Sequence, residues 1–120
     1  MDITHPELVK SLVKPGRKIL AEMSPSDANL THMVIGISGE AGELLDTIKK
    51  KTIYQKELDM LNVVEELGDL EFYMEGLRQE LNITRDECLI HNIMKLSKRY
   101  EKLTYSNQAA QDRADKTIGD

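Results

Sequence analysis

Two stretches of sequence decide the fold, and each carries two carboxylates three residues apart: Gly39-Glu40-Ala41-Gly42-Glu43-Leu44-Leu45 and Glu65-Glu66-Leu67-Gly68-Asp69-Leu70. Both lie within apolar patterns of helical period, so each pair shares one helix face, about one turn apart. Two such helices packed antiparallel would direct four acidic groups into one space, those of Glu40, Glu43, Glu66 and Asp69. A hard cation such as Mg²⁺ or Mn²⁺ would relieve their repulsion. The two stretches therefore predict paired helices with a carboxylate metal site.

The composition limits the protein to one modest domain. With 120 residues, one Phe and no Trp, residues 1–120 are expected to form a single domain with an aliphatic core over about 26–101. The formal net charge of -5 argues against a nucleic-acid polymer as partner, although not against a nucleotide. There is no apolar run of membrane-span length and no signal-peptide pattern, and the lone Cys88 fits a reducing compartment. We therefore expect a cytoplasmic protein without a membrane partner.

Apolar periodicity and turn residues predict four main helices and an all-α fold. The first covers residues 7–23 and is broken at Lys14-Pro15-Gly16. The second runs to about residue 51, with Ser26 or Asp27 as its N-cap, and the third spans about 58–81. The fourth begins at Arg85, after a capping box at 84–87, and reaches about residue 101. The polar tail, 102–120, is expected to be partly extended.

The apolar residues of the second and third helices are expected to face the core of the bundle. These inward positions are Leu30, Met33, Val34, Ile37, Leu44, Leu45 and Ile48 in the second helix, and Leu61, Val64, Leu67, Leu70, Met74, Leu77 and Leu81 in the third. Four glycines interrupt the same helices: Gly36, Gly39, Gly42 and Gly68. Each costs roughly 1 kcal/mol relative to Ala, so we expect either close helix approach or room for a ligand beside the carboxylates.

Other metal classes are excluded by inspection. No Glu is followed three residues later by His, as di-iron bundles require, and the chain has no His-Glu-x-x-His motif, EF-hand loop or Gly-x-x-x-x-Gly-Lys phosphate loop. Ligation by carboxylates alone favours Mg²⁺ or Mn²⁺, which usually act on a phosphate substrate.

With the flanking residues included, the chain resembles MazG-like members of the all-α nucleoside triphosphate pyrophosphohydrolase superfamily. That pattern has Glu-x-x-Glu on one helix and Glu-x-x-Asp on the next, matched by the four carboxylates above. Asn92-Ile93-Met94-Lys95-Leu96-Ser97-Lys98-Arg99-Tyr100 is similar to the family's Asn-x-x-Lys-Leu-x-x-Arg-Tyr. Residues 105–116 resemble the tails of small phage and bacterial members, so the likeness covers about 30–116. Gly39 departs from the pattern, because many relatives carry Glu there.

The resemblance implies a MazG-like four-helix bundle that assembles as a homodimer or as a dimer of dimers, a homotetramer. It implies Mg²⁺-dependent hydrolysis of nucleoside or deoxynucleoside triphosphates to monophosphate and pyrophosphate, in the host cytoplasm if the protein is phage-encoded. The four carboxylates would hold Mg²⁺, or Mn²⁺, and form the catalytic centre, with Glu40 or Glu43 as the general base. Helical spacing adds candidate substrate contacts, and the family match supports the last three: His32, Tyr73, Asn92, Lys95 and Arg99.

Two other functions stay open at this point. The first keeps the enzyme but changes its substrate to an alarmone such as (p)ppGpp. A non-catalytic helical interaction module would carry the acidic pairs as solvated surface features. The module predicts no metal-dependent activity and tolerance of substitution at all four carboxylates.

Overall fold

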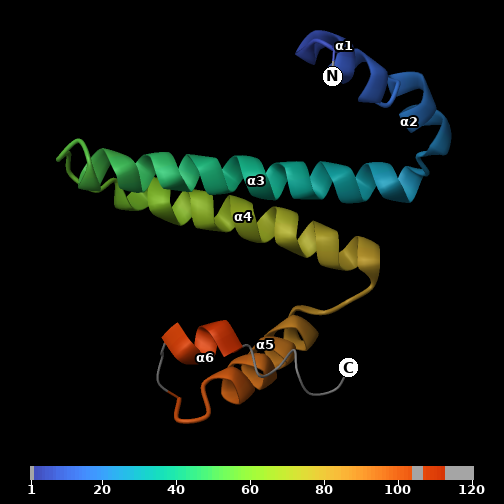
Figure 1. Ribbon diagram of the computed structural model, residues 1–120. Coiled ribbons are helices and arrows are strands. Elements are labelled where there is room, and N and C mark those ends of the chain that lie inside the picture. Colours follow the sequence, from blue (N-terminus) through green and yellow to red (C-terminus); the bar gives the residue numbers. More distant parts are fainter. Residues whose placement is uncertain (1, 104–106, 113–120) are drawn as a thin grey trace.

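Figure 1 shows the computed structural model of the protein, which describes residues 2–103 and 107–112. Every regular element in those ranges is a helix, in the order α1 His5–Leu12, α2 Gly16–Glu22, α3 Pro25–Thr52, α4 Met60–Leu81, α5 Arg85–Arg99 and α6 Asn107–Asp112. The predicted all-α class is therefore confirmed. None of the described helices combines the length and the apolar character needed to cross a membrane.

Short polar residues set where the long helices begin. The Ser24 hydroxyl accepts a hydrogen bond from the Asp27 N–H, and the Asp27 carboxylate accepts one from the Ser24 N–H, each at 3.0 Å. The predicted N-cap at Ser26 or Asp27 is therefore wrong. Ser24 is the cap because Pro25 takes the first helical position, where a missing N–H costs nothing. Thr84 caps α5 by accepting from the Glu87 N–H at 3.1 Å.

The breaks between helices largely follow the expected turn chemistry. The predicted break near Pro15 is confirmed, since α1 ends at Leu12 and α2 begins at Gly16. Asn82, which ends α4, has a left-handed backbone with φ of 56°, a conformation that Asn tolerates well. Within the tail, which was expected to be partly extended, residues 107–112 form α6. Residues 104–106 and 113–120 of that tail lie outside the described residues.

Helices α3 and α4 form an antiparallel hairpin that is the main packing unit of the chain (Figure 1). Near its closed end, Asn62 of α4 donates a hydrogen bond to the Thr47 hydroxyl of α3, and Thr47 is the one buried residue among those described. Near its open end, the Asn29 amide donates to the Glu80 carboxylate at 3.2 Å. Polar contacts therefore fix the register of the hairpin at both ends.

A four-helix bundle is not closed within one chain. Helix α5 leaves the open end of the hairpin and lies apart from it, in contact with α6, while α1 and α2 lie on the other side (Figure 1). The Cα radius of gyration is 20.4 Å, whereas a compact chain of this length would have about 14 Å. The four predicted helices are present, with the first in two pieces, but among the described residues only the second and third pack along their length.

Many of the predicted inward positions are consequently wrong within a single chain. No apolar side chain in the described part of the protein is fully buried. The expected core residues that are exposed are Val34, Leu45, Ile48, Leu61, Val64, Leu67 and Leu81. A two-helix hairpin can cover only one stripe on each helix, so the apolar residues beside that stripe have nothing to pack against.

Candidate functional site

Three of the four predicted carboxylates meet across the hairpin. Glu40 on α3 and Glu66 and Asp69 on α4 each offer a carboxylate oxygen, and these oxygens lie within 4.8 Å of one another. Glu40 and Glu66 are half-buried and Asp69 is exposed. We call these three residues the acidic cluster. The antiparallel pairing of the two motifs brings them together, as the sequence predicts.

Glu66 is the most perturbed member of the acidic cluster. Its pKa is raised from 4.5 to about 7, chiefly by a hydrogen bond with the Glu40 carboxyl, then by burial and by the negative charges of Glu40, Glu43 and Asp69. Its Oε2 atom is closed off from solvent and has no hydrogen-bond donor. When Glu40 and Glu66 are both ionised, neither can donate a hydrogen bond to the other. A proton shared between the two carboxyl groups would give Oε2 of Glu66 a hydrogen-bond partner.

The acidic cluster also has the ligand chemistry that suits a divalent cation. The acidic cluster offers only carboxylate oxygens, the ligands that Mg²⁺ and Mn²⁺ prefer. Oε2 of Glu66 is already withdrawn from water and lacks a partner, so ligation would satisfy it without further loss of hydration. Exposure of Asp69 leaves one side of the cluster open to solvent, where a substrate group or water would complete the coordination.

Glu43 lies outside the acidic cluster. It is exposed on α3, one turn after Glu40, and its carboxylate is not among the three converging groups. Its charge still contributes to the raised pKa of Glu66. The structure therefore brings together three of the four proposed ligands and places the fourth at the solvent edge of the site.

His32 and Tyr73 lie together beside the site. Their ring centroids are 6.2 Å apart in an edge-on arrangement, and Tyr73 also meets Phe72 edge-on at 5.2 Å. Gly36 makes room for Tyr73, because a Cβ at Gly36 would overlap the Tyr73 ring. Tyr73 follows Asp69 by one turn, so the three rings extend the site along the hairpin toward its open end.

The glycines divide between the two roles considered from the sequence. The absence of a side chain at Gly36 allows α3 and α4 to approach each other closely. By contrast, a Cβ at Gly39, Gly42 or Gly68 would meet no neighbouring atom. These last three leave open space on the hairpin next to the carboxylates. A Cβ at Gly76 would likewise overlap the Met33 side chain across the hairpin, so Gly76 also allows close approach of the two helices.

The predicted contacts on α5 are not brought to the acidic cluster within one chain. Asn92 is exposed, and Lys95 and Arg99 are half-buried. Figure 1 shows α5 apart from the hairpin, below α4, and α5 does not pack along α3 or α4 in the described part of the chain. A single chain therefore has the acidic half of the predicted site without the cationic half.

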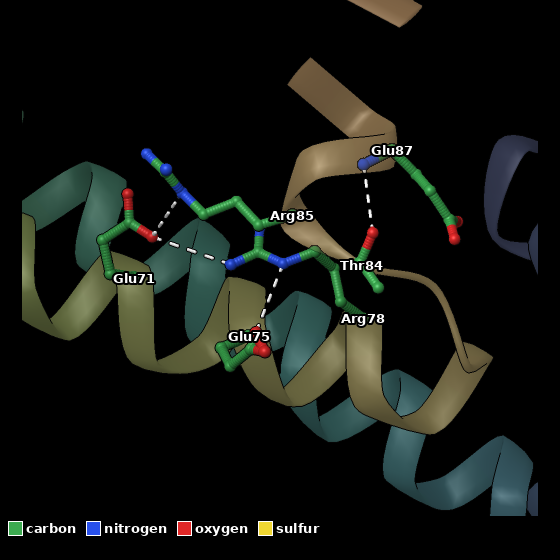
Figure 2. A network of polar contacts seen from close by, with 6 residues as sticks. All are labelled: Glu71, Glu75, Arg78, Thr84, Arg85 and Glu87. Atoms are coloured by element: carbon green, nitrogen blue, oxygen red, sulfur yellow. Dashed lines mark hydrogen bonds and ion pairs between the residues drawn. The ribbon is translucent and has the colours of Figure 1, made fainter. Parts of the chain in front are cut away.

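An ion-pair network that was not predicted from the sequence joins the start of α5 to α4. The Glu71 carboxylate lies 3.7 Å from the Arg78 guanidinium and 4.0 Å from that of Arg85, and Arg78 also pairs with Glu75 at 3.4 Å (Figure 2). The Arg78 side chain is only 11% exposed. The spacing of Glu71, Glu75 and Arg78 at i, i+4 and i+7 is the signal that would have indicated this shared helix face.

Comparison of the chain with family models, curated proteins and solved structures gives no match.

Proposed function

We propose that this protein is a MazG-like pyrophosphohydrolase that converts nucleoside or deoxynucleoside triphosphates to monophosphate and pyrophosphate with Mg²⁺ or Mn²⁺. The observation that carries the proposal is the convergence of Glu40, Glu66 and Asp69, with an oxygen of Glu66 that lacks a partner. The likeness of the Glu-x-x-Glu and Glu-x-x-Asp motifs to that family supports the choice of reaction.

The acidic cluster would hold the cation through Glu40, Glu66 and Asp69. When bound, the cation would supply positive charge to the phosphate oxygens and to the leaving pyrophosphate. In the overall reaction, a water oxygen bonds to the α-phosphorus as the bond from that phosphorus to the bridging oxygen breaks. Pyrophosphate leaves with the electron pair, and the water gives up a proton.

Glu43 is the best candidate for the group that takes this proton. It is exposed, one turn from Glu40, and outside the converging set, so its carboxylate keeps a free oxygen for a water molecule. A general base must come within hydrogen-bond reach of the water that it activates. Tyr73 and His32 would line the path of the nucleotide, since their rings lie together one to two turns from the acidic cluster.

The functional unit in this proposal is a homodimer or a homotetramer. The exposed apolar side chains of α3 and α4 support association, because two hairpins would bury the stripes that one leaves open.

A panel of nucleotides incubated with the protein and Mg²⁺, scored separately for pyrophosphate and monophosphate, tests the reaction. Equimolar monophosphate and pyrophosphate from at least one triphosphate is the expected result. Including (p)ppGpp in the panel tests the alarmone alternative. No turnover of any member, together with unchanged stability on adding Mg²⁺, would favour a non-catalytic helical module.

A further inference from the structure

Two contacts between α3 and α4 enclose the acidic cluster along the hairpin. On the side of the closed end, the Asn62 amide of α4 donates a hydrogen bond to the Thr47 hydroxyl of α3. On the side of the open end, Gly36 of α3 lies against the Tyr73 ring of α4. We call these the Thr47–Asn62 contact and the Gly36–Tyr73 contact. They lie about 16 Å apart along the hairpin, with the carboxylates between them.

The Thr47–Asn62 contact joins the two acidic motifs. Thr47 follows Glu43 by one turn, and its hydroxyl also donates to the Glu43 carbonyl at 3.1 Å. Asn62 precedes Glu66 by one turn on the same face of α4. One buried hydroxyl therefore ties the turn that carries Glu43 to the turn that leads to Glu66. Because hydrogen bonds are directional and short, this contact fixes both the register and the separation of the helices.

The Gly36–Tyr73 contact has the equivalent position on the other side of the acidic cluster. Gly36 precedes Glu40 by one turn, and Tyr73 follows Asp69 by one turn. A Cβ at Gly36 would overlap the Tyr73 ring, so the ring rests on the backbone of α3 and limits how closely the helices approach. The steps from the carboxylates to the contacts are equal on both helices, so the register is the same on both sides of the acidic cluster.

The separation of the helices decides which cation the acidic cluster can hold. Glu40 comes from α3, while Glu66 and Asp69 come from α4, and their converging oxygens lie within 4.8 Å of one another. Mg²⁺ demands near-ideal octahedral geometry with short bonds, whereas Ca²⁺ accepts bonds about 0.4 Å longer in a flexible arrangement. A change of this size in the distance between α3 and α4 is therefore enough to alter the balance between the two ions.

We propose that Thr47 and Asn62 are positioning residues that set the size of the metal site. Together with the Gly36–Tyr73 contact, their hydrogen bond holds α3 and α4 at a separation that favours Mg²⁺ relative to Ca²⁺. Neither residue belongs to the converging groups, so both act through the helix turns that carry the carboxylates. This inference rests on the metal site of the proposed function and does not depend on the reaction.

Metal binding without nucleotide tests the positioning role. Isothermal titration with Mg²⁺ and then with Ca²⁺ gives a ratio of the two dissociation constants for each protein. Thr47→Val and Asn62→Ala both remove the hydrogen bond and should shift this ratio toward Ca²⁺ by about tenfold, since loss of groups that orient metal ligands costs about 10–100-fold in affinity. Asn62→Ala leaves no amide without an acceptor, so it is informative even if Thr47→Val does not fold. Thr47→Ser keeps the hydroxyl and should keep the wild-type ratio.

Asn29 provides the control for a purely structural effect. Its amide donates to the Glu80 carboxylate at 3.2 Å between the same two helices, but it lies three turns from Glu40. Asn29→Ala therefore removes a comparable polar contact and should leave the ratio of dissociation constants unchanged. A wild-type ratio in Asn62→Ala and in any folded Thr47→Val, or an equal shift in Asn29→Ala, would overturn the proposal.

Turnover separates this inference from the proposed function. If wild type hydrolyses a nucleotide, Asn62→Ala should need a higher Mg²⁺ concentration for half-maximal rate, while its KM for nucleotide at saturating Mg²⁺ should match that of wild type. If wild type binds Mg²⁺ but hydrolyses no nucleotide, the proposed reaction fails, and the ratios of dissociation constants alone decide the positioning role. If wild type binds neither cation, the acidic cluster is not a metal site, and both proposals fail.

Discussion

Gly36 of α3 lies directly against the ring of Tyr73 of α4, so the two helices approach each other there more closely than any residue with a Cβ would allow. The contact fixes Tyr73 one turn from Asp69 and beside His32. It therefore determines both the separation of the helices and the position of an aromatic ring next to the acidic cluster.

Gly36→Ala should destabilise the hairpin. Overpacking of this kind costs about 1–3 kcal/mol, which exceeds the gain of roughly 1 kcal/mol from replacing a helical Gly with Ala. Gly42→Ala, on the same helix but in open space, should keep that gain and stabilise the protein. Urea unfolding of both variants measures the two changes in unfolding free energy. Changes of the same sign would contradict the close contact at Gly36.

The raised pKa of Glu66 predicts a specific dependence of stability on pH in metal-free protein. Folding raises this pKa from 4.5 to about 7, so the folded state keeps a proton that the unfolded chain has lost between those values. The stabilisation is complete below pH 4.5 and is lost as pH rises through 7. With EDTA present, wild type should lose stability relative to Glu66→Gln over this window. Parallel pH profiles of the two proteins would show that Glu66 is unperturbed.

Divalent cation should stabilise the folded protein through the acidic cluster. At a concentration about 100 times its Kd, Mg²⁺ bound only to the folded state would add about 2.7 kcal/mol to the unfolding free energy. Asp69→Asn should diminish this effect and also stabilise the metal-free protein by removing a like charge. Asp46→Asn is the control, since Asp46 pairs with Lys50 outside the cluster. Equal responses of both variants to Mg²⁺ in thermal melts would place the binding site elsewhere.

Substitutions of Thr47 and Asn62 should have strongly non-additive effects on the unfolding free energy. Thr47 is buried, donates to the Glu43 carbonyl at 3.1 Å and accepts from the Asn62 amide. Thr47→Val leaves the half-buried Asn62 amide without this acceptor, at a cost of about 1–3 kcal/mol. Adding Asn62→Leu should recover much of that loss. Additive effects of the two changes in a double-mutant cycle would mean that the contact contributes nothing.

The sequence predicted the helices and the acidic cluster well, because both depend on local spacing. Proline, Ser and Thr mark the breaks and caps, and i,i+3 carboxylates must share a helix face wherever that helix packs. The N-cap of α3 was misplaced because Ser24, Ser26 and Asp27 are all good caps, and only the position of Pro25 in the first turn decides among them.

Burial and the position of α5 were not predictable in the same way. Helical periodicity identifies an apolar stripe but not the partner that covers it, so Leu61 and Leu70 looked equivalent although only Leu70 is partly covered within the chain. At the start of α5, Arg85 lies 4.0 Å from Glu71 of α4, and a contact of this kind between two helices leaves no periodic signal in the sequence. The convergence of the carboxylates could therefore be predicted from the sequence. The position of α5, which carries Asn92, Lys95 and Arg99, could not.

The hairpin also has a kinetic consequence. Its two helices follow each other directly in the chain, so their contacts close a short loop, and such contacts form fast. In the proposed homodimer, the surfaces that remain uncovered are then filled by an encounter between two molecules. Refolding should therefore show a rapid phase independent of protein concentration, followed by a slower phase whose rate increases with concentration.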